Sequence, residues 1–190
     1  MSWGSYYWKI IHYLALNDVG HEWLSKLVDY IPCEECKEHW VNPITGCDLI
    51  EWSLEMHNKV NNKLGRWDKW DRNDFEIAHK NECEICNGIS YNFDKIWHFI
   101  HIVAHIGENN RNDTIKMLKE FQNIYPCAIC RNQLFLDDPM EKETLYDWTV
   151  RHHNRINNEN RSYIIYIDQT CYGCSSNISI MTAIANAELS

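Results

Sequence analysis

Apolar side chains recur at intervals of three and four residues through most of the chain, which is the spacing of one buried helix face. In the first 80 residues this pattern predicts five helices, the last of them short. They are expected around Ile10–Leu16 and over residues 21–30, 33–41, 49–64 and 71–79. Asp48 is placed to cap the fourth helix and Gly65 to end it. The chain is therefore expected to begin with a helical unit.

The same spacing continues in the second half of the chain. The helices expected there cover residues 93–105, 113–124, 127–135 and 142–158. Tyr163–Ile167 is β-branched and aromatic, which favours a short strand. A final helix is expected from Ser176 or Asn177, with Ile178, Met181 and Ile184 on its apolar face. The overall class predicted by these patterns is all-α.

Four sequence signals occur twice in the same order, and such repeats decide how a fold is organised. They are Trp-x-x-x-His at Trp8 and Trp97, Pro-Cys-x-x-Cys at Pro32 and Pro126, His-Asn-x-Val/Ile-Asn at His57 and His153, and Cys-x-x-Cys at Cys83 and Cys171. This order predicts an internal duplication, with a first half of residues 1–89 and a second half of residues 90–190. No linker rich in glycine or proline separates the halves, so we expect them to pack together.

The composition narrows the possible partners. The 190 residues carry a formal net charge of −9, and 45% of them are hydrophobic. This charge argues against nucleic acid or an anionic membrane as the main partner. The sequence shows neither a transmembrane span nor the basic and apolar regions of a secretory signal. A cytoplasmic protein with a substantial core is therefore expected.

Cysteine is abundant, with nine residues in the chain. Eight fall into four Cys-x-x-Cys pairs, and Cys47 is expected to be a buried or idle thiol. Such pairs in a chain without a secretory signal indicate metal binding or redox chemistry. Cys33 and Cys36 follow a proline at the expected start of a helix. The partial positive charge of a helix N-terminus favours the thiolate, so this pair is predicted to be a redox dithiol.

Aromatic, imidazole and amide side chains share helix faces. Trp8 and His12 are four residues apart, as are His57 and Asn61. Together they could line a slot for a flat ligand with polar edges, because indole and imidazole rings stack and amides pair with ring-edge groups. The alternative is that Trp8 and His12 are ordinary core residues. Recurrence of the same residue types in the second half favours the ligand.

These motifs in combination resemble the FAD-linked sulfhydryl oxidases of the Erv/ALR family. The resemblance covers nearly all of residues 3–65 and again residues 97–158. It implies a small helical bundle with four main helices and a short fifth, which binds FAD. It also implies the reaction, in which a dithiol and O2 give a disulfide and hydrogen peroxide. The expected partners are thiol-containing protein substrates, with O2 as the electron acceptor.

The resemblance assigns roles to residues in both halves. In the first half Cys36 would be the thiol next to the flavin and Cys33 the thiol that exchanges with substrate. The residues expected to contact FAD there are Gly4, Trp8, His12, His57, Asn58, Asn61, Lys63 and Arg66. The corresponding residues of the second half are Trp97, His101, His153, Asn154 and Asn157, with Cys127 and Cys130 as the dithiol.

The second half departs from the family pattern at two places. Phe93 stands where Gly4 does, and Glu159-Asn160-Arg161 replaces Lys63-Leu64-Gly65. The resemblance implies that the basic groups of the Lys63–Arg66 stretch approach the FAD phosphates. An acid gained at that place weakens FAD binding by Coulomb repulsion. FAD is therefore expected more firmly in the first half. The family usually forms two-fold dimers, so the two halves are expected to pack as a pseudo-dimer within one chain.

The outer cysteine pairs allow three interpretations. Cys83, Cys86, Cys171 and Cys174 could pass electrons from substrate thiols to the inner dithiols, form structural disulfides, or bind one zinc ion between them. Zinc would make the chain a non-enzymatic helical module, but it would not explain the repeated Trp, His and Asn motifs. A further alternative is an oxidase with only one competent half. Trp67 and Trp70 have no assigned role.

The resemblance also bears on the compartment. Small oxidases of this family without a targeting segment occur in large DNA viruses, so the cytoplasm of an infected cell or a virion is compatible with the sequence.

Overall fold

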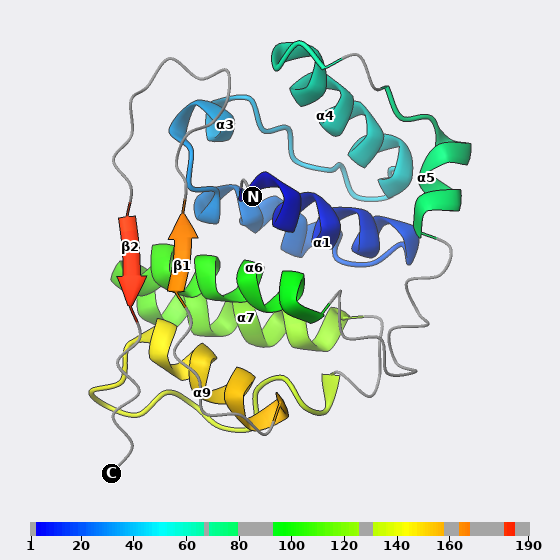
Figure 1. Cartoon of the computed structure of the whole chain (residues 1–190). Helices are drawn as coiled ribbons and strands as arrows, with labels where there is room; N and C mark the ends of the chain where they lie inside the picture. Colours follow the sequence, from blue (N-terminus) through cyan, green and yellow to red (C-terminus); the bar gives the residue numbers. More distant parts are fainter. Residues whose placement is uncertain are drawn as a thin grey trace.

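The computed structural model describes residues 3–66, 69–79, 93–125, 131–157, 164–167 and 181–184. Within them the chain is predominantly helical, as predicted (Figure 1). No helix among these residues is long and apolar enough to cross a membrane.

The first half forms the expected helices. These are α1 (Gly4–Leu16), α2 (His21–Lys26) with the 3₁₀ turn η1 (Leu27–Tyr30), α3 (Glu34–Glu38), α4 (Leu49–Lys63) and α5 (Arg72–His79). Asp48 caps α4 as predicted, because its carboxylate accepts hydrogen bonds from the backbone N–H groups of Ile50 and Glu51. Gly65 follows α4 with a positive φ of 65°, which suits glycine.

Helix α3 is shorter than predicted. It ends at Glu38, whereas the sequence pattern suggested a helix as far as Val41. The Val41 carbonyl instead accepts a hydrogen bond from the indole of Trp52 on α4, at 2.9 Å. The chain beyond Glu38 is therefore not helical, and this hydrogen bond ties it to α4.

The second half follows the same plan. It contains α6 (Phe93–Ile106), the 3₁₀ turn η3 (Gly107–Asn110), α7 (Arg111–Ile124) and α9 (Leu145–Asn157). Helix α9 starts three residues later than expected, because the Thr144 hydroxyl accepts the backbone N–H of Asp147 as a cap does. The helix expected over 127–135 lies partly outside the described residues, and in the described part only Arg131 is helical. The carbonyls of Gln133 and Leu134 accept hydrogen bonds from Arg155 instead.

Two short strands form an antiparallel pair. β1 (Ile164–Ile167) pairs with β2 (Met181–Ile184), with Ile164 opposite Ile184. The first strand was predicted from its β-branched residues. The final helix predicted to include Met181 and Ile184 is wrong, because these residues pair with β1 through their backbones. The all-α prediction therefore holds for the two helical units but misses this sheet.

The two halves share one hydrophobic core. α6 packs against α1 on one side and α9 on the other, and α2 packs against α7 (Figure 1). Across this contact the rings of Tyr7 and Phe99 lie 4.9 Å apart, and those of Trp23 and Phe121 lie 5.1 Å apart. The Trp23 indole also donates to the carbonyl of Met117 at 3.0 Å. The expectation that the halves pack together rather than hang on a linker agrees with these contacts.

Candidate functional site

Three predicted ligand-binding residues of the first half form a ring cluster. Trp8 and His12 come from α1 and His57 from α4. The Trp8 and His57 rings are stacked, with centroids 4.3 Å apart and an angle of 12° between their planes. His57 Nδ1 and His12 Nε2 are 3.1 Å apart and share a hydrogen bond. The predicted meeting of these side chains from two helices is present in the structure.

The second half contains a ring cluster of the same form. Trp97 and His101 come from α6 and His153 from α9. The rings of Trp97 and His153 are stacked, with centroids 4.7 Å apart and 10° between their planes. His101 Nε2 and His153 Nδ1 are 3.0 Å apart. Tryptophan and the two histidines therefore have one arrangement in both halves.

Burial distinguishes the two ring clusters. Trp97, His101 and His153 are each at most 2% exposed. In the first cluster only His12 is buried, whereas Trp8 and His57 are half-buried. The Trp97 indole N–H is buried and has no hydrogen-bond partner among the described residues. The first cluster is thus partly exposed to solvent. The second is fully buried and encloses the Trp97 indole N–H, which has no partner among the described residues.

Burial also keeps the imidazoles neutral. It lowers the pKa of His57 to about 4, with a further lowering from the charge of Arg66. It lowers the pKa of His153 to about 3, with a smaller contribution from His98. The pKa of His101 falls well below its usual range, mainly through burial and then through His153. Near neutral pH the rings of His57, His101 and His153 are therefore uncharged, and they can stack on an aromatic ligand without the cost of burying a charge.

These shifted pKa values predict a loss of stability in mild acid. An unfolded histidine takes up a proton near pH ~6.5, whereas folded His57 does so only at about 4. Between these values the unfolded state binds more protons, so stability falls as the pH falls, by ~1.4 kcal/mol per pH unit for each such imidazole. Urea unfolding of the whole protein between pH 7.5 and pH 4.5 measures this slope.

Two variants show whether the imidazole is the source. His57→Gln is expected to make the pH dependence of the free energy of unfolding shallower, by the ~1.4 kcal/mol per pH unit that one such imidazole contributes. Gln133→Ala removes an exposed side chain that carries no titratable group and should leave the slope as it is. An unchanged slope in His57→Gln would contradict the assignment.

The predicted amides have different surroundings. Asn58 pairs with the backbone of Trp70, donating to its carbonyl at 2.9 Å and accepting its N–H at 3.0 Å. This pairing places the Trp70 ring against His57, with centroids 6.0 Å apart. Asn61 is buried, and Asn154 is half-buried. Asn157 is the last residue of α9, and Gly4 is the first residue of α1.

Helix α5 completes the first ring cluster. Arg72 bonds to Asp48 and Glu51 at the start of α4, at 2.7 and 3.1 Å. This attachment brings Phe75 edge-on to His12, with centroids 4.9 Å apart. Trp70 and Phe75 were not predicted to take part. The expected short fifth helix pointed to this region, but nothing in its spacing showed which side chains turn inward.

Thr149 is another site residue that sequence analysis missed. Its hydroxyl lies 2.8 Å from His101 Nδ1, so it fixes the orientation of that ring. Thr149 precedes His153 by four residues and shares its helix face, which is the signal that could have identified it.

The first dithiol lies at the start of α3, as predicted. Cys33 is the N-cap residue and only 1% exposed, whereas Cys36 is half-buried. The backbone N–H of Cys36 donates to the sulfur of Cys33 at 3.3 Å. Between them Glu35 forms an ion pair with Lys63 at the end of α4. Lys63, expected near FAD phosphates, therefore links the dithiol segment to the helix that bears His57.

The other predicted cysteines lie outside the described residues. These are Cys127, Cys130, Cys83, Cys86, Cys171 and Cys174. In the part of the chain that the structure does describe, no three histidine, cysteine or acidic side chains gather as a metal site would require. Cys47 is half-buried rather than buried. Arg66 is exposed, beyond the end of α4.

The fold and its sites thus define a helical protein with paired Trp-His-His ring clusters and, in the first half, a dithiol attached to the helix that bears His57. Residues 94–178 match the sequence model of the Erv1 / Alr family. The matched residues lie in the half in which FAD was expected less firmly. No curated protein and no solved structure matches the chain.

Proposed function

We propose that this protein is an FAD-dependent sulfhydryl oxidase. Two substrate thiols lose two electrons and two protons and join in a disulfide, and O2 accepts both electrons and both protons to give H2O2. The observation that carries this proposal is the Trp-His-His ring cluster, which is built in the same way in both halves. The match of residues 94–178 to the Erv1 / Alr family supports it.

The residues present fit a flavin nucleotide. In the first half, Trp8 and His57 offer a partly exposed stack of a large ring and a neutral imidazole. In the second half, the unpaired Trp97 indole N–H is a buried donor that an acceptor of the ligand would satisfy. FAD supplies the two-electron chemistry with O2 when bound. Trp8, His12, His57 and Asn61 would hold it in the first half, and Trp97, His101, His153 and Asn154 in the second.

The dithiols would carry electrons from the substrate to this site. A substrate thiolate would attack the oxidised inner pair to form a mixed disulfide, and the second substrate thiol would resolve it. The substrate leaves as a disulfide and the inner pair is left reduced, with two electrons to pass to the cofactor. We assign the exchange to Cys33 and Cys127 and the position next to the flavin to Cys36 and Cys130. Because Cys33 is buried, exchange requires movement of α3, which has only five residues. The Lys63–Glu35 ion pair would set how easily it moves.

We further propose that the two halves form a pseudo-dimer of duplicated units. The packing of α1 on α6 and of α2 on α7 supports this, because helices that occupy matching places in the sequence pair with each other. The outer cysteine pairs would act as shuttles between a protein substrate and the inner dithiols. Removing the outer pairs should slow oxidation of a protein substrate more than oxidation of a small dithiol. Equal effects on the two substrates would reject the shuttle.

One observation favours a second candidate, an oxidase with a single competent half. The second ring cluster is closed around Trp97, so a ligand can enter it only if the surrounding side chains open. Losing one site would leave that half as a packing partner for the other.

Counting the flavin in the purified chain tests these proposals. We expect a yellow protein with two FAD molecules per chain, measured from its visible absorbance against protein concentration. Trp8→Ala and Trp97→Ala, made separately, should each remove one of the two. One FAD per chain, lost only in Trp8→Ala, would establish the single-site form. A colourless protein that consumes no O2 with dithiothreitol would overturn the oxidase.

A further inference from the structure

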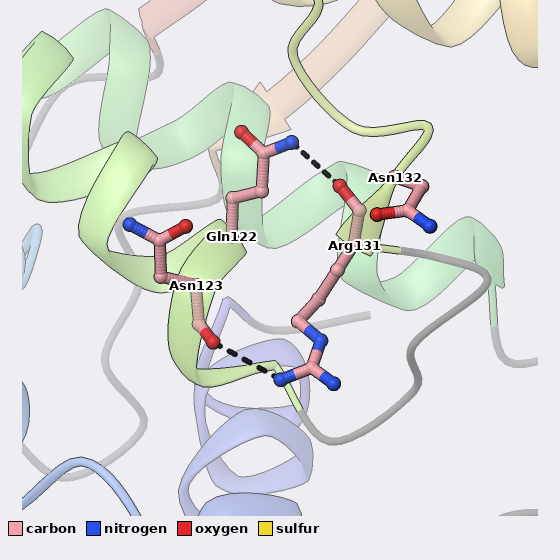
Figure 2. Close-up of a pocket in the computed structure, with 4 residues that line it drawn as sticks. All are labelled: Gln122, Asn123, Arg131 and Asn132. Carbon is pink, nitrogen blue, oxygen red and sulfur yellow. Dashed lines mark hydrogen bonds between the residues drawn. The ribbon is translucent and has the colours of Figure 1, made fainter.

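A polar pocket of about 490 Å³ lies at the end of α7. The described residues that line it are Gln122 and Asn123 from the last turn of α7, and Arg131 and Asn132, which follow the second Pro-Cys-x-x-Cys motif in the sequence (Figure 2). Gln122 donates its amide N–H to the Arg131 carbonyl, and the Arg131 guanidinium donates to the Asn123 carbonyl at 3.3 Å. These two hydrogen bonds join the walls of the pocket.

The pocket residues flank the second dithiol in the sequence. Arg131 directly follows Cys130. The opposite wall ends at Asn123, four residues before Cys127. We therefore expect a substrate side chain that binds in this pocket to lie within a few residues of the substrate cysteine that reacts with the second dithiol.

The charge of the pocket selects an anion. Of the described residues that line it, three carry amides and the fourth a guanidinium, and none of these four carries a carboxylate. Among the ion pairs of the described residues none involves Arg131, although the whole chain carries a net charge of −9. A guanidinium presents several N–H donors in a fork that matches a carboxylate.

The first half carries acidic residues at two of the corresponding sequence positions. Counted from its Pro-Cys-x-x-Cys motif, Lys37 stands where Arg131 does, and it is paired with Glu34 at 2.7 Å. Asp29 and Glu38 stand where Asn123 and Asn132 do. Acids therefore surround the first dithiol, and amides and one cation flank the second.

We propose that this pocket docks the substrate of the second dithiol by binding a carboxylate side chain close to the substrate cysteine. The proposal rests on the oxidase function proposed above and names its substrate class, which is a protein or peptide dithiol flanked by acidic residues. Arg131 holds the carboxylate, and the amides of Asn123 and Asn132 bind polar backbone groups of the substrate segment that carries it. The first dithiol, surrounded by acids, does not share this preference.

Two synthetic peptides test the proposal. Both carry the same reduced Cys-Gly-Gly-Cys dithiol, flanked by glutamates in one and by lysines in the other. In a Cys36→Ser background, which confines turnover to the second dithiol, KM should be about five-fold lower for the glutamate peptide. Arg131→Glu should reverse this preference and leave dithiothreitol oxidation unchanged. Lys116→Glu, the same charge change on an exposed residue of α7, should keep it.

The outcomes separate the pocket from the oxidase. Equal KM values for the two peptides, or the same reversal in Lys116→Glu, would overturn the docking pocket. A wild-type protein that fails to oxidise dithiothreitol would instead contradict the proposed function. Calorimetric binding of the disulfide forms of both peptides needs no turnover. If the glutamate peptide binds more tightly than the lysine peptide, and Arg131→Glu removes this difference, the docking pocket is supported even in a protein without oxidase activity. Equal binding of the two peptides would reject the pocket.

Discussion

Replacing Cys36 and Cys130 together by serine is expected to abolish thiol oxidation, with a fall in turnover of at least about 100-fold. Serine keeps the size of the side chain but cannot form a thiolate or a disulfide, so electrons have no path from the exchange thiol onward. The rate is measured as O2 consumption with dithiothreitol. Cys36→Ser alone should leave the activity of the second half.

The serine variants need two controls. FAD content should be unchanged, because serine keeps the size of each side chain and leaves the stacked tryptophan and histidine rings as they are. Cys47→Ser changes a half-buried thiol outside the Cys-x-x-Cys pairs and should retain full activity. Full activity in the Cys36→Ser, Cys130→Ser double variant would end the oxidase hypothesis, whereas loss of activity in Cys47→Ser would point to general misfolding.

Phe99→Ala is expected to lower the free energy of unfolding by ~3–5 kcal/mol, because it removes a fully buried ring and leaves a cavity. Phe99 contacts Tyr7 and Trp23 of the first half and Phe121 of the second. The loss should therefore be felt by both halves. Urea unfolding, followed by far-UV circular dichroism and by tryptophan fluorescence, should give one transition at a lower midpoint for both probes.

An exposed apolar residue provides the control. Ile77→Ala on α5 truncates a side chain that is 66% exposed, and it should change the midpoint little. Two separate transitions in the wild-type protein would show that the halves unfold independently. That result would contradict a core shared between them.

Most of the helices could be predicted because their signals are local. The cap at Asp48, the stop at Gly65 and the apolar spacing of α1, α4, α6 and α7 each depend on residues within a few positions. The ring clusters could be predicted for a similar reason. Spacing of four residues on one helix, repeated with the same residue types in the second half, indicated side chains that face a common partner.

Other features depend on distant partners and could not be predicted. Val41 is suited to a helix, but its carbonyl is taken by the Trp52 indole on another element. Met181 and Ile184 have helical spacing, yet their backbones pair with the earlier strand β1, Ile184 with Ile164 and Met181 with Ile167. The inward position of Phe75 follows from the anchoring of Arg72 on α4. Each of these is decided by tertiary contact rather than by local preference.

The contact of α1 with α6 has a consequence for symmetry. In a dimer of identical chains, every substitution appears on both sides of the two-fold axis at once. In the proposed pseudo-dimer the two sides belong to one chain, so Lys37 and Arg131, or Glu38 and Asn132, can change one at a time. The assembly also keeps its two faces together at any dilution, because no second molecule has to be found. One polypeptide can therefore hold two unlike docking faces in a fixed ratio of one to one.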